Sequence, residues 1–436
     1  MTTEFVCDNI AVNEKGHLTF AGRDTLDLAA QYGTPLYLTD EERIRHNCRI
    51  YKEAFAKYFP EGSCPAYASK AASFKAIYRI MAEEHMHVDV ASCGELYTAL
   101  KAGYDLKDAF FHGNNKTDAD IHFAMDNGIG CFVADNEEEV LAVEREAAAR
   151  GIRQRILLRI TPGIDPHTYA AISTGQVDSK FGAAIETGQA ETLARMTLSQ
   201  EHIQLDGFHC HIGSQVFAED VFERTVKVML EFIASIKEKT GYEAPMLDLG
   251  GGYGVRYVTT DPYLDIGEKI ASVAEVLKDE CARLGLKVPA IMMEPGRSIV
   301  ADAGMTLYTA GTVKRITGYK NYVSVDGGMT DNPRYALYGA RYTVLAAGKM
   351  QEENGTEFTI AGHNCESGDV IQEKVLLPDN MGRGDLVAVC TTGAYNYSMA
   401  SNYNRYGRPA MIMLAKDREY TAIRRETLDD LLQWDV

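Results

Sequence analysis

The sequence predicts an α/β protein that combines a (β/α)8 barrel with a C-terminal, mainly β domain. Apolar runs of strand length alternate with segments of helical periodicity between residues 64 and 293, and there are eight such runs. After residue 303 the helical pattern fades, and alternating or β-branched segments divided by glycine turns replace it. We therefore predict an N-terminal arm over residues 1–34, a barrel over 35–303 and a β domain over 304–436.

The predicted elements follow one another in a regular order. The arm contains a short alternating piece at 17–22 and a helix over 25–32, and a helix over 40–58 opens the barrel region. Barrel strands are predicted over residues 64–69, 87–91, 109–112, 130–134, 155–160, 205–212, 246–249 and 290–293. Helices between them include 74–84, 95–102, 137–150 and 218–239. In the β domain, strand patterns span 306–315, 322–325, 357–360 and 386–390.

A doubly wound open sheet is the alternative arrangement of the same repeated units. No GxGxxG follows the first strand, as the dinucleotide-binding form of that fold would require. Eight regular units also match a closed barrel better than an open sheet, so we favour the barrel.

Composition and charge limit the possible partners and the compartment. The chain has 436 residues, 46% of them hydrophobic, and a formal net charge of -18, which argues against nucleic acid as a partner. Its nine cysteines form no CxxC pair, which is typical of reduced thiols in a cytoplasmic protein. The N-terminus lacks a signal-peptide pattern, and no apolar run approaches the roughly 20 residues that span a bilayer. We expect a cytoplasmic protein that acts on a small molecule, with no membrane partner.

Lys70 is the first candidate for chemistry. It follows the first predicted barrel strand and is flanked by small residues, Ala71 and Ala72, so nothing bulky blocks the approach of an aldehyde to its amine. Such a lysine can form a Schiff base. Most lysines are solvated surface groups, so this stretch alone does not decide between the two interpretations.

Polar and glycine residues follow several other predicted strands, at the end where barrel enzymes carry their chemistry. These residues are Asp89 and Ser92, HGNNK at 112–116, HCHIGS at 209–214, LDLGGGYG at 247–254 and EPGR at 294–297. The run Gly250, Gly251 and Gly252 lets backbone N–H groups turn toward an anion such as a phosphate. A tight strand-to-helix turn is the alternative interpretation of the glycines.

Two histidines, His209 and His211, lie two apart on a predicted strand and so face the same way. Cys210 faces the opposite side and no third ligand is evident, so we expect no metal. An imidazole packed flat on a cofactor ring is the functional interpretation, and a hydrogen-bonded core histidine is the alternative. With Lys70, a phosphate cradle and a carboxylate at Glu294 to pair with a pyridine nitrogen, the set describes a pyridoxal 5'-phosphate site.

The chain resembles the diaminopimelate decarboxylases, which belong to the alanine-racemase-like class of pyridoxal phosphate enzymes. The resemblance runs nearly end to end, and its fold is the one predicted above, with the N-terminal arm joining the C-terminal β domain. The motifs that carry it are YASKA around Lys70, VDVAS around Asp89, HGNNK, SKFG at 179–182, GFHCHIGSQ at 207–215, LDLGGGYG, EPGR, RYALYGA at 334–340, CESGD at 365–369 and GAY at 393–395.

The resemblance implies a role for each matching cofactor residue. Lys70 would hold pyridoxal 5'-phosphate as a Schiff base, His211 would stack on its ring, and Glu294 would meet the pyridine nitrogen. The phosphate would be held by Ser214, Gly250, Gly251, Gly252 and Tyr395. The remaining cofactor-binding residues expected from the motifs are Asp89, Pro295, Gly296 and Arg297.

The resemblance also implies a substrate site shared between two subunits. Arg297, Arg334 and Tyr338 would bind substrate carboxylate, with Tyr395 beside them. The CESGD loop would enter from the second subunit of a homodimer, so that Cys365 supplies the catalytic proton and Glu366 recognises the distal ammonium. The implied reaction is decarboxylation of meso-2,6-diaminopimelate to L-lysine and CO2, the last step of lysine biosynthesis.

Three departures from the family pattern leave alternatives open. Cys93 stands where relatives usually have a second glycine, Tyr335 replaces a common proline, and residues 363–364 replace a proline-containing lead to CESGD. None removes a functional group, but they could alter the distal substrate pocket. The closest alternative is a related decarboxylase that acts on D-lysine or D-ornithine. A non-catalytic relative that only binds the cofactor is a second alternative, against which the retention of Lys70, Glu294 and Cys365 argues.

Overall fold

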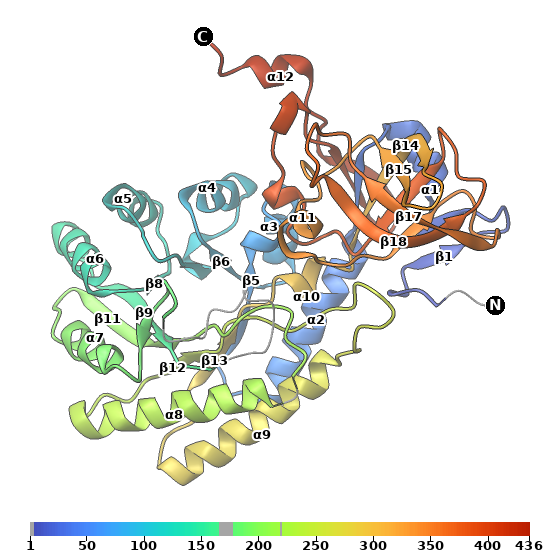
Figure 1. The fold of residues 1–436 in the computed structure, drawn as a ribbon. Helices are drawn as coiled ribbons and strands as arrows, with labels where there is room; N and C mark the ends of the chain where they lie inside the picture. Colours follow the sequence, from blue (N-terminus) through green and yellow to red (C-terminus); the bar gives the residue numbers. More distant parts are fainter. Residues whose placement is uncertain (1–3, 165–177, 219) are drawn as a thin grey trace. The chain divides into compact units, whose positions relative to one another are not determined.

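The computed structural model describes residues 4–164, 178–218 and 220–436. It contains two compact units, which we describe separately (Figure 1). The barrel unit comprises Asn47–Gly254 and Leu264–Gly296, and the β unit comprises Met1–His46, Val255–Tyr263 and Arg297–Val436. The predicted boundaries at residues 34 and 303 stay a prediction. No helix in the described ranges is long and apolar enough to cross a membrane.

The barrel unit contains the closed parallel barrel that the sequence predicts. Each of eight described strands is hydrogen-bonded to the next, and the last pairs with the first through Met292 beside Cys64 and Met293 beside Pro65. In their order around the barrel the strands are β5 (Cys64–Ala68), β6 (His87–Val90), β7 (Ala109–Phe111), β8 (Cys131–Ala134), β9 (Gln154–Thr161), β11 (Ile203–His209), β12 (Met246–Asp248) and β13 (Ala290–Met293). The short β10 (Ala183–Ala184) adds one further pairing to β9.

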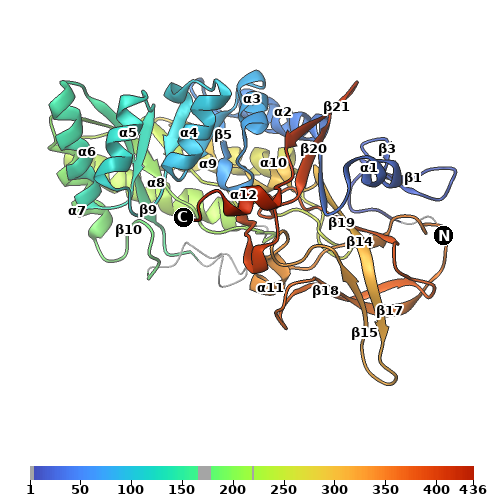
Figure 2. The same cartoon turned by 90° about the horizontal axis from the view of Figure 1, so that it is seen from above.

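Helices alternate with these strands and lie on their outer side (Figures 1 and 2). They are α2 (Glu41–Tyr58), α3 (Lys75–Glu83), α4 (Cys93–Ala102), α5 (Asp118–Asp126), α6 (Glu137–Arg150), α7 (Gln189–Leu198), α8 (Val221–Thr240) and α9 (Ile266–Leu284). The predicted helix over 218–239 includes residue 219, which lies outside the described residues. Side chains cap several helix starts; Ser92, for example, accepts from the N–H of Glu95 at the start of α4.

The β unit is built around a nine-stranded sheet. Its main path runs β18 (Val370–Pro378), β17 (Asn354–Ala361), β15 (Asn321–Val325), β14 (Gly304–Arg315), β4 (Leu36–Asp40), β20 (Ala410–Leu414) and β21 (Glu419–Ile423). Off this path, β19 (Leu386–Cys390) pairs with both β14 and β16 (Val344–Ala346). Three short helices complete the unit: α10 (Arg297–Val300), α11 (Arg334–Tyr338) and α12 (Leu428–Leu432). Residues 36–40, predicted within the barrel region, form a strand of this sheet.

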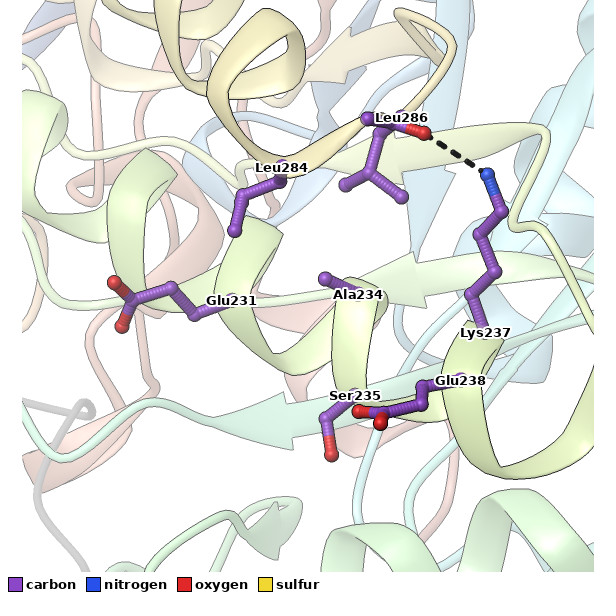
Figure 3. Close-up of a pocket in the computed structure, with 8 residues that line it drawn as sticks. Glu231, Ala234, Ser235, Lys237, Glu238, Leu284 and Leu286 are labelled. Atoms are coloured by element: carbon purple, nitrogen blue, oxygen red, sulfur yellow. Dashed lines mark hydrogen bonds between the residues drawn. The ribbon is translucent and has the colours of Figure 1, made fainter.

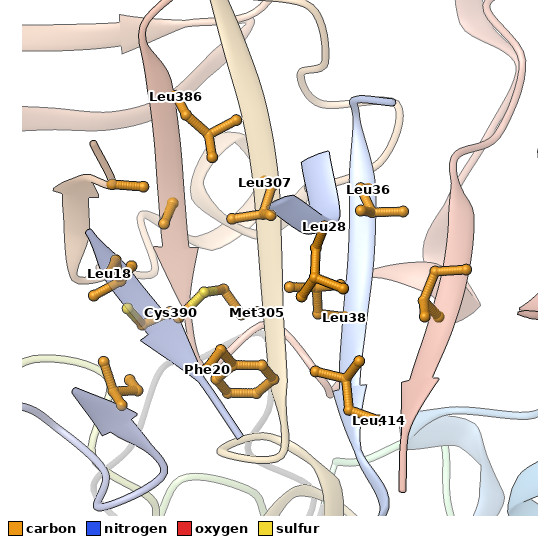
Figure 4. Close-up of a cluster of buried hydrophobic side chains, with 14 of the residues drawn as sticks. Leu18, Phe20, Leu28, Leu36, Leu38, Met305, Leu307, Leu386, Cys390 and Leu414 are labelled. Atoms are coloured by element: carbon orange, nitrogen blue, oxygen red, sulfur yellow. The ribbon is translucent and has the colours of Figure 1, made fainter. Parts of the chain in front are cut away.

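The N-terminal arm packs into the core of the β unit. It consists of β1 (Ile10–Val12), β2 (Leu18–Phe20), β3 (Arg23–Asp24) and α1 (Thr25–Tyr32), the last spanning the predicted residues. Figure 4 shows Leu18, Phe20 and Leu28 of the arm against Met305, Leu307 and other residues of the sheet, all buried. Because burying a large apolar side chain contributes about 1.5–3 kcal/mol, this shared core holds the arm on the sheet.

Candidate active site

The inner face of the barrel changes from apolar to polar toward the carboxyl ends of the strands. Side chains from strands far apart in the barrel order form one buried cluster: Ala66, Phe110, Cys131, Val133, Leu157 and Met292. Residues two apart on a strand share a face. A buried polar side chain stands two positions after an apolar residue that belongs to this cluster or packs against it. These polar residues are His112, Arg159, Asp248 and Glu294. These groups are therefore directed to the interior at the end of the barrel where active sites lie.

Lys70 lies on a single 3-10 turn, Ser69–Ala71, directly after β5. The strand ends at Ala68 rather than at the predicted residue 69. Ser69 fixes the turn because its hydroxyl lies 2.5 Å from the Asp89 carbonyl oxygen and 3.1 Å from the Glu95 carboxylate, and its single O–H donates within this pair of acceptors. The Lys70 side chain is exposed, while Ala71 is buried beside it. The turn thus presents the amine on a backbone that its neighbours hold in place.

The Glu294 carboxylate lies between two imidazoles at the end of β13. His112 Nε2 is 2.8 Å from Glu294 Oε1, and His209 Nε2 is 3.4 Å from Oε2. All three side chains are almost fully buried. Burial raises the pKa of Glu294, but the two neighbouring imidazoles, His112 first and then His209, outweigh burial and hold that pKa well below its usual range. Glu294 is therefore an ionised carboxylate in the barrel interior.

Two other acids at the same end of the barrel shift in the opposite direction. Burial, and then the negative charge of Glu294, raise the pKa of Asp248 well above its ordinary value. Burial raises the pKa of Asp89 to about 6, against the opposing effect of His112. Asp248 also accepts a hydrogen bond from the N–H of Gly250 at 2.8 Å. Asp248 is therefore neutral and Glu294 beside it is ionised, so the two acids can have different chemical roles.

His211 is held next to the glycine run. β11 ends at His209, three residues before the predicted 212, so the two-residue alternation does not extend to His211. Its Nδ1 accepts from the N–H of Gly251 at 3.2 Å. Burial, and then the positive charge of Lys70, lower the pKa of His211 well below 6.5, so the ring is neutral at pH 7. A neutral ring beside the lysine matches the predicted stacking role, which stays a prediction.

The three glycines allow the ends of neighbouring strands to approach closely. A Cβ at Gly250 would lie 2.5 Å from the carbonyl oxygen of Cys210, and one at Gly251 would lie 2.2 Å from that of Glu294. Gly252 has φ +126°, and a Cβ there would lie 2.5 Å from the Gly213 carbonyl oxygen, next to Ser214. The N–H groups of Gly250 and Gly251 donate to protein atoms. The run therefore sets backbone geometry, and its phosphate role stays a prediction.

The EPGR motif packs on the turn that carries Lys70. The carbonyl of Pro295 accepts from the N–H of Ala68 at 3.1 Å. A Cβ at Gly296 would lie 2.9 Å from the Ala68 carbonyl oxygen and 3.1 Å from the Ala71 Cβ. Only glycine therefore fits at position 296 without a shift of the Lys70 turn. This contact explains why glycine follows Glu294 so closely in the sequence.

A second group of predicted residues lies in the β unit. Arg297 donates to the hydroxyl of Tyr257 at 2.7 Å, and its guanidinium lies 4.7 Å from the centre of the Tyr395 ring. Arg334 donates to the hydroxyl of Tyr342 at 2.7 Å and lies 4.5 Å from the centre of the Tyr257 ring. Tyr257 thus contacts both arginines, and both arginines are buried. Tyr395 has φ 62°, a left-handed conformation that is uncommon outside glycine and typical of functional positions.

The remaining predicted residues of the β unit are more exposed. Tyr338 is the last residue of α11 and is half-buried. Cys365 and Glu366 are exposed, in a loop that is fastened at both ends. The N–H of Cys365 donates to Asn404 at 2.7 Å, and Asp369 accepts from the N–H of Asn364 at 2.7 Å. The predicted site residues therefore form one set in each unit.

Several site residues were not assigned a role from the sequence. His112 was noted only as part of HGNNK, and Tyr257 and Tyr342 lie in no recognised motif. Arg159 is buried on β9, with its guanidinium 4.3 Å from the centre of the Phe181 ring in SKFG. For His112 and Arg159 a signal was present, because each follows a buried apolar residue of its strand by two positions. The tyrosines gave no comparable signal.

Two other features of the barrel unit have the spacing or the shape of a site. The ligand atoms of His112, His209 and Glu294 lie within 4.8 Å of one another, close enough for a metal ion. Direct pairing of His112 with Glu294 accounts for the same spacing, so it does not by itself indicate a metal. A hollow of about 520 Å3 lies between α8 and the C-terminal end of α9. Glu231, Lys237 and Leu286 are among its lining residues, which Figure 3 shows. None of its lining residues is a predicted site residue, so we give it no catalytic role.

The donor set of the barrel end fits pyridoxal 5'-phosphate. An exposed lysine amine, a neutral imidazole and a buried ionised carboxylate are the groups that bind the aldehyde, the ring and the protonated pyridine nitrogen. Glycines 250–252 keep side chains away from the segment that carries Ser214. The residues present therefore fit the cofactor that the motifs predict.

Comparison with known proteins identifies the family. The family model of the pyridoxal binding domain of pyridoxal-dependent decarboxylases matches residues 41–301. A diaminopimelate decarboxylase of Bacillus subtilis (strain 168) is 43% identical over 424 residues, which cover 97% of this chain and 96% of that protein. The chain belongs to the pyridoxal-dependent diaminopimelate decarboxylase family. The resemblance seen in the motifs and the predicted cofactor are both confirmed.

Solved structures of the diaminopimelate decarboxylase family share the whole fold. The crystal structure of the M. jannaschii diaminopimelate decarboxylase in co-complex with L-lysine has a TM-score of 0.90 and 33% identity, with 98% of both chains covered. A lysine/ornithine decarboxylase from Vibrio vulnificus, complexed with putrescine, has a TM-score of 0.73 and 23% identity, with 90% of this chain and 97% of that chain covered. The second comparison concerns the fold alone.

Proposed function

We propose that the protein decarboxylates meso-2,6-diaminopimelate to L-lysine and CO2 with pyridoxal 5'-phosphate. The observation that carries the proposal is the buried, ionised Glu294 at the end of the barrel that presents Lys70, in a chain 43% identical to a diaminopimelate decarboxylase. The M. jannaschii relative is described in complex with L-lysine, the product of this reaction. Retention of the full donor set argues against a non-catalytic relative.

The cofactor supplies an electron sink for the electron pair that CO2 leaves behind. Lys70 would bind its aldehyde, Glu294 its pyridine nitrogen, and His211 the face of its ring. Ser214, Gly250, Gly251, Gly252 and Tyr395 are the proposed phosphate ligands, and Asp89, Pro295, Gly296 and Arg297 complete the set. Because Glu294 is ionised and Asp248 beside it is neutral, Glu294 would be the negatively charged partner of the pyridine nitrogen and would favour its protonated form.

Substrate recognition is proposed for the arginines and tyrosines of the β unit. Arg297 and Arg334, each fixed by a tyrosine hydroxyl, can present planar donor pairs to carboxylates. Tyr338 and Tyr395 would contribute hydroxyl groups, and Glu366 would pair with the distal ammonium. Cys365 would donate the proton from Sγ to the carbon that has lost CO2.

We also propose a homodimer with shared active sites and a cytoplasmic location. In the single chain Cys365 and Glu366 are exposed, as expected for residues that complete a neighbour's site. All nine cysteines are free, which is typical of a reducing compartment.

The test is a direct substrate comparison. Purified protein with pyridoxal 5'-phosphate is incubated separately with meso-diaminopimelate, D-lysine, D-ornithine, L-lysine and L-ornithine, and CO2 release is measured. We expect kcat/KM to be highest for meso-diaminopimelate. Preference for D-lysine or D-ornithine would support the alternative decarboxylase. No CO2 from any of the five, in protein shown by its visible absorbance to hold the cofactor, would support the non-catalytic relative.

A further inference from the structure

We propose that His112 is a positioning residue that holds the Glu294 carboxylate in the orientation needed to meet the pyridine nitrogen of the cofactor. This inference rests on the role of Glu294 in the proposed function. His112 lies in the HGNNK motif and is not among the proposed ligands of the cofactor.

The backbone at His112 is fixed, and so is the direction of its side chain. Its N–H donates to the Val90 carbonyl at 2.8 Å, which continues the ladder between β7 and β6 past the end of the strand. The ring packs edge-on against His209, with centroids 5.0 Å apart and an angle of 72°. His112 Nε2 lies 2.8 Å from Glu294 Oε1 and 3.8 Å from Asp89 Oδ1. The imidazole of His112 is therefore in direct contact with the Glu294 carboxylate.

The rest of the motif anchors the loop that follows His112. Lys116 is buried, and its Nζ donates to the carbonyls of Gly113 and Val133 at 2.9 Å each and to Glu139 at 2.6 Å. A buried lysine with three acceptors holds its segment rigidly, because each broken contact would leave a polar group unpaired. His112 is therefore placed by β7 on one side and by this anchor on the other.

His209 is the more distant partner of Glu294. Its Nε2 is 3.4 Å from Oε2, and burial lowers the pKa of His209 to about 4, so the ring is neutral at pH 7. The shorter contact belongs to His112. Without it, burial would favour the protonated form of Glu294, which could not stabilise a positive charge on the pyridine nitrogen.

The test measures cofactor binding rather than turnover. Apoprotein is titrated with pyridoxal 5'-phosphate and with 1-deazapyridoxal 5'-phosphate, in which carbon replaces the ring nitrogen. His112→Asn should weaken binding of pyridoxal 5'-phosphate about tenfold or more and change binding of the carbon analogue much less, because only the nitrogen needs Glu294. His112→Gln should retain much of the affinity, since its longer side chain can bring an amide N–H to the carboxylate.

Two control variants separate the possible outcomes. His202 pairs with Glu144 at 2.9 Å just before β11 begins, at the opposite end of that strand from His209, and His202→Asn should change neither titration. Glu294→Gln should show the same selective loss as His112→Asn. Selective loss in Glu294→Gln without loss in His112→Asn would overturn this inference and leave the proposed function intact. Equal loss of both ligands in His112→Asn would mean a general structural role, and no selectivity in Glu294→Gln would overturn the proposed role of Glu294 itself.

Discussion

Replacing Arg334 with lysine tests which carboxylate of the substrate the protein recognises. Arg334 begins α11 and is 5% exposed. Its Nη1 donates to the Tyr342 hydroxyl at 2.7 Å, and its guanidinium lies 4.5 Å from the centre of the Tyr257 ring. These two contacts fix the plane of the guanidinium. Lysine keeps the charge but cannot offer two parallel donors in a fixed plane.

The size of the effect follows from the donors that remain. A guanidinium has five N–H groups, and Tyr342 uses one on Nη1, which leaves a pair for a bidentate carboxylate contact. A hydrogen bond to a charged group contributes about 1.5–3 kcal/mol, and about 1.4 kcal/mol corresponds to a tenfold change. Arg334→Lys should therefore raise KM for meso-diaminopimelate about ten- to a hundredfold.

The assay compares two substrates that differ in one carboxylate. Meso-diaminopimelate keeps the carboxylate of its L-centre through the reaction, whereas D-lysine has no such group. KM and kcat are measured for both with Arg334→Lys and with Arg341→Lys, a control at an exposed arginine of the same unit. We expect a large change for meso-diaminopimelate alone, and only in Arg334→Lys. Equal losses on both substrates would refute the assignment of Arg334 to the retained carboxylate.

Three further predictions concern the lysine, the dimer and the pH dependence of stability. Lys70→Ala should lower activity by orders of magnitude and abolish the visible absorbance of the bound cofactor. Tm should change little because the Lys70 side chain is exposed, and wild-type turnover would contradict the role of Lys70. When Lys70→Ala and Cys365→Ala proteins are mixed and exchange subunits, about a quarter of the sites should regain activity. No recovery after confirmed exchange would exclude a shared site. Burial raises the pKa of Asp331 to about 7, so this group makes the folded protein less stable as pH rises from about 4 to 7. Asp331→Asn should therefore be more stable than wild type above pH 7, by up to about 4 kcal/mol in urea unfolding, and the difference should vanish below pH 4.

The elements that could be predicted from the sequence are those with local signals. All eight barrel strands and the helix α1 were predicted because their apolar patterns and flanking turns lie within a few residues of one another. The strand β4 was missed because all five of its residues are buried and no alternation marks it. Its partners, β14 and β20, lie more than two hundred residues further along the chain.

In the candidate site too, the residues that stand in local sequence motifs could be predicted, and those that meet only through distant contacts could not. Glycines, Lys70 and Glu294 stand in motifs, so their importance could be predicted before the fold was known. The contacts of Tyr257 with Arg297 and Arg334 join three separate segments, and nothing near Tyr257 in the sequence indicates them. The end of β11 was placed too late because the apolar pattern continues through Ile212 after the strand hydrogen bonds have ended.

The ionisation of the barrel acids depends on contacts that no single motif contains. Asp89, Asp248 and Glu294 are all buried to a similar degree, so burial alone would raise the pKa of each. Two imidazoles approach Glu294 and lower its pKa, whereas Asp248 has the N–H of Gly250 and faces the negative charge of Glu294. The imidazoles come from β7 and β11, and the three acids come from β6, β12 and β13. Closure of the barrel therefore decides which acid has a lowered pKa, because only the closed barrel brings His112 to Glu294.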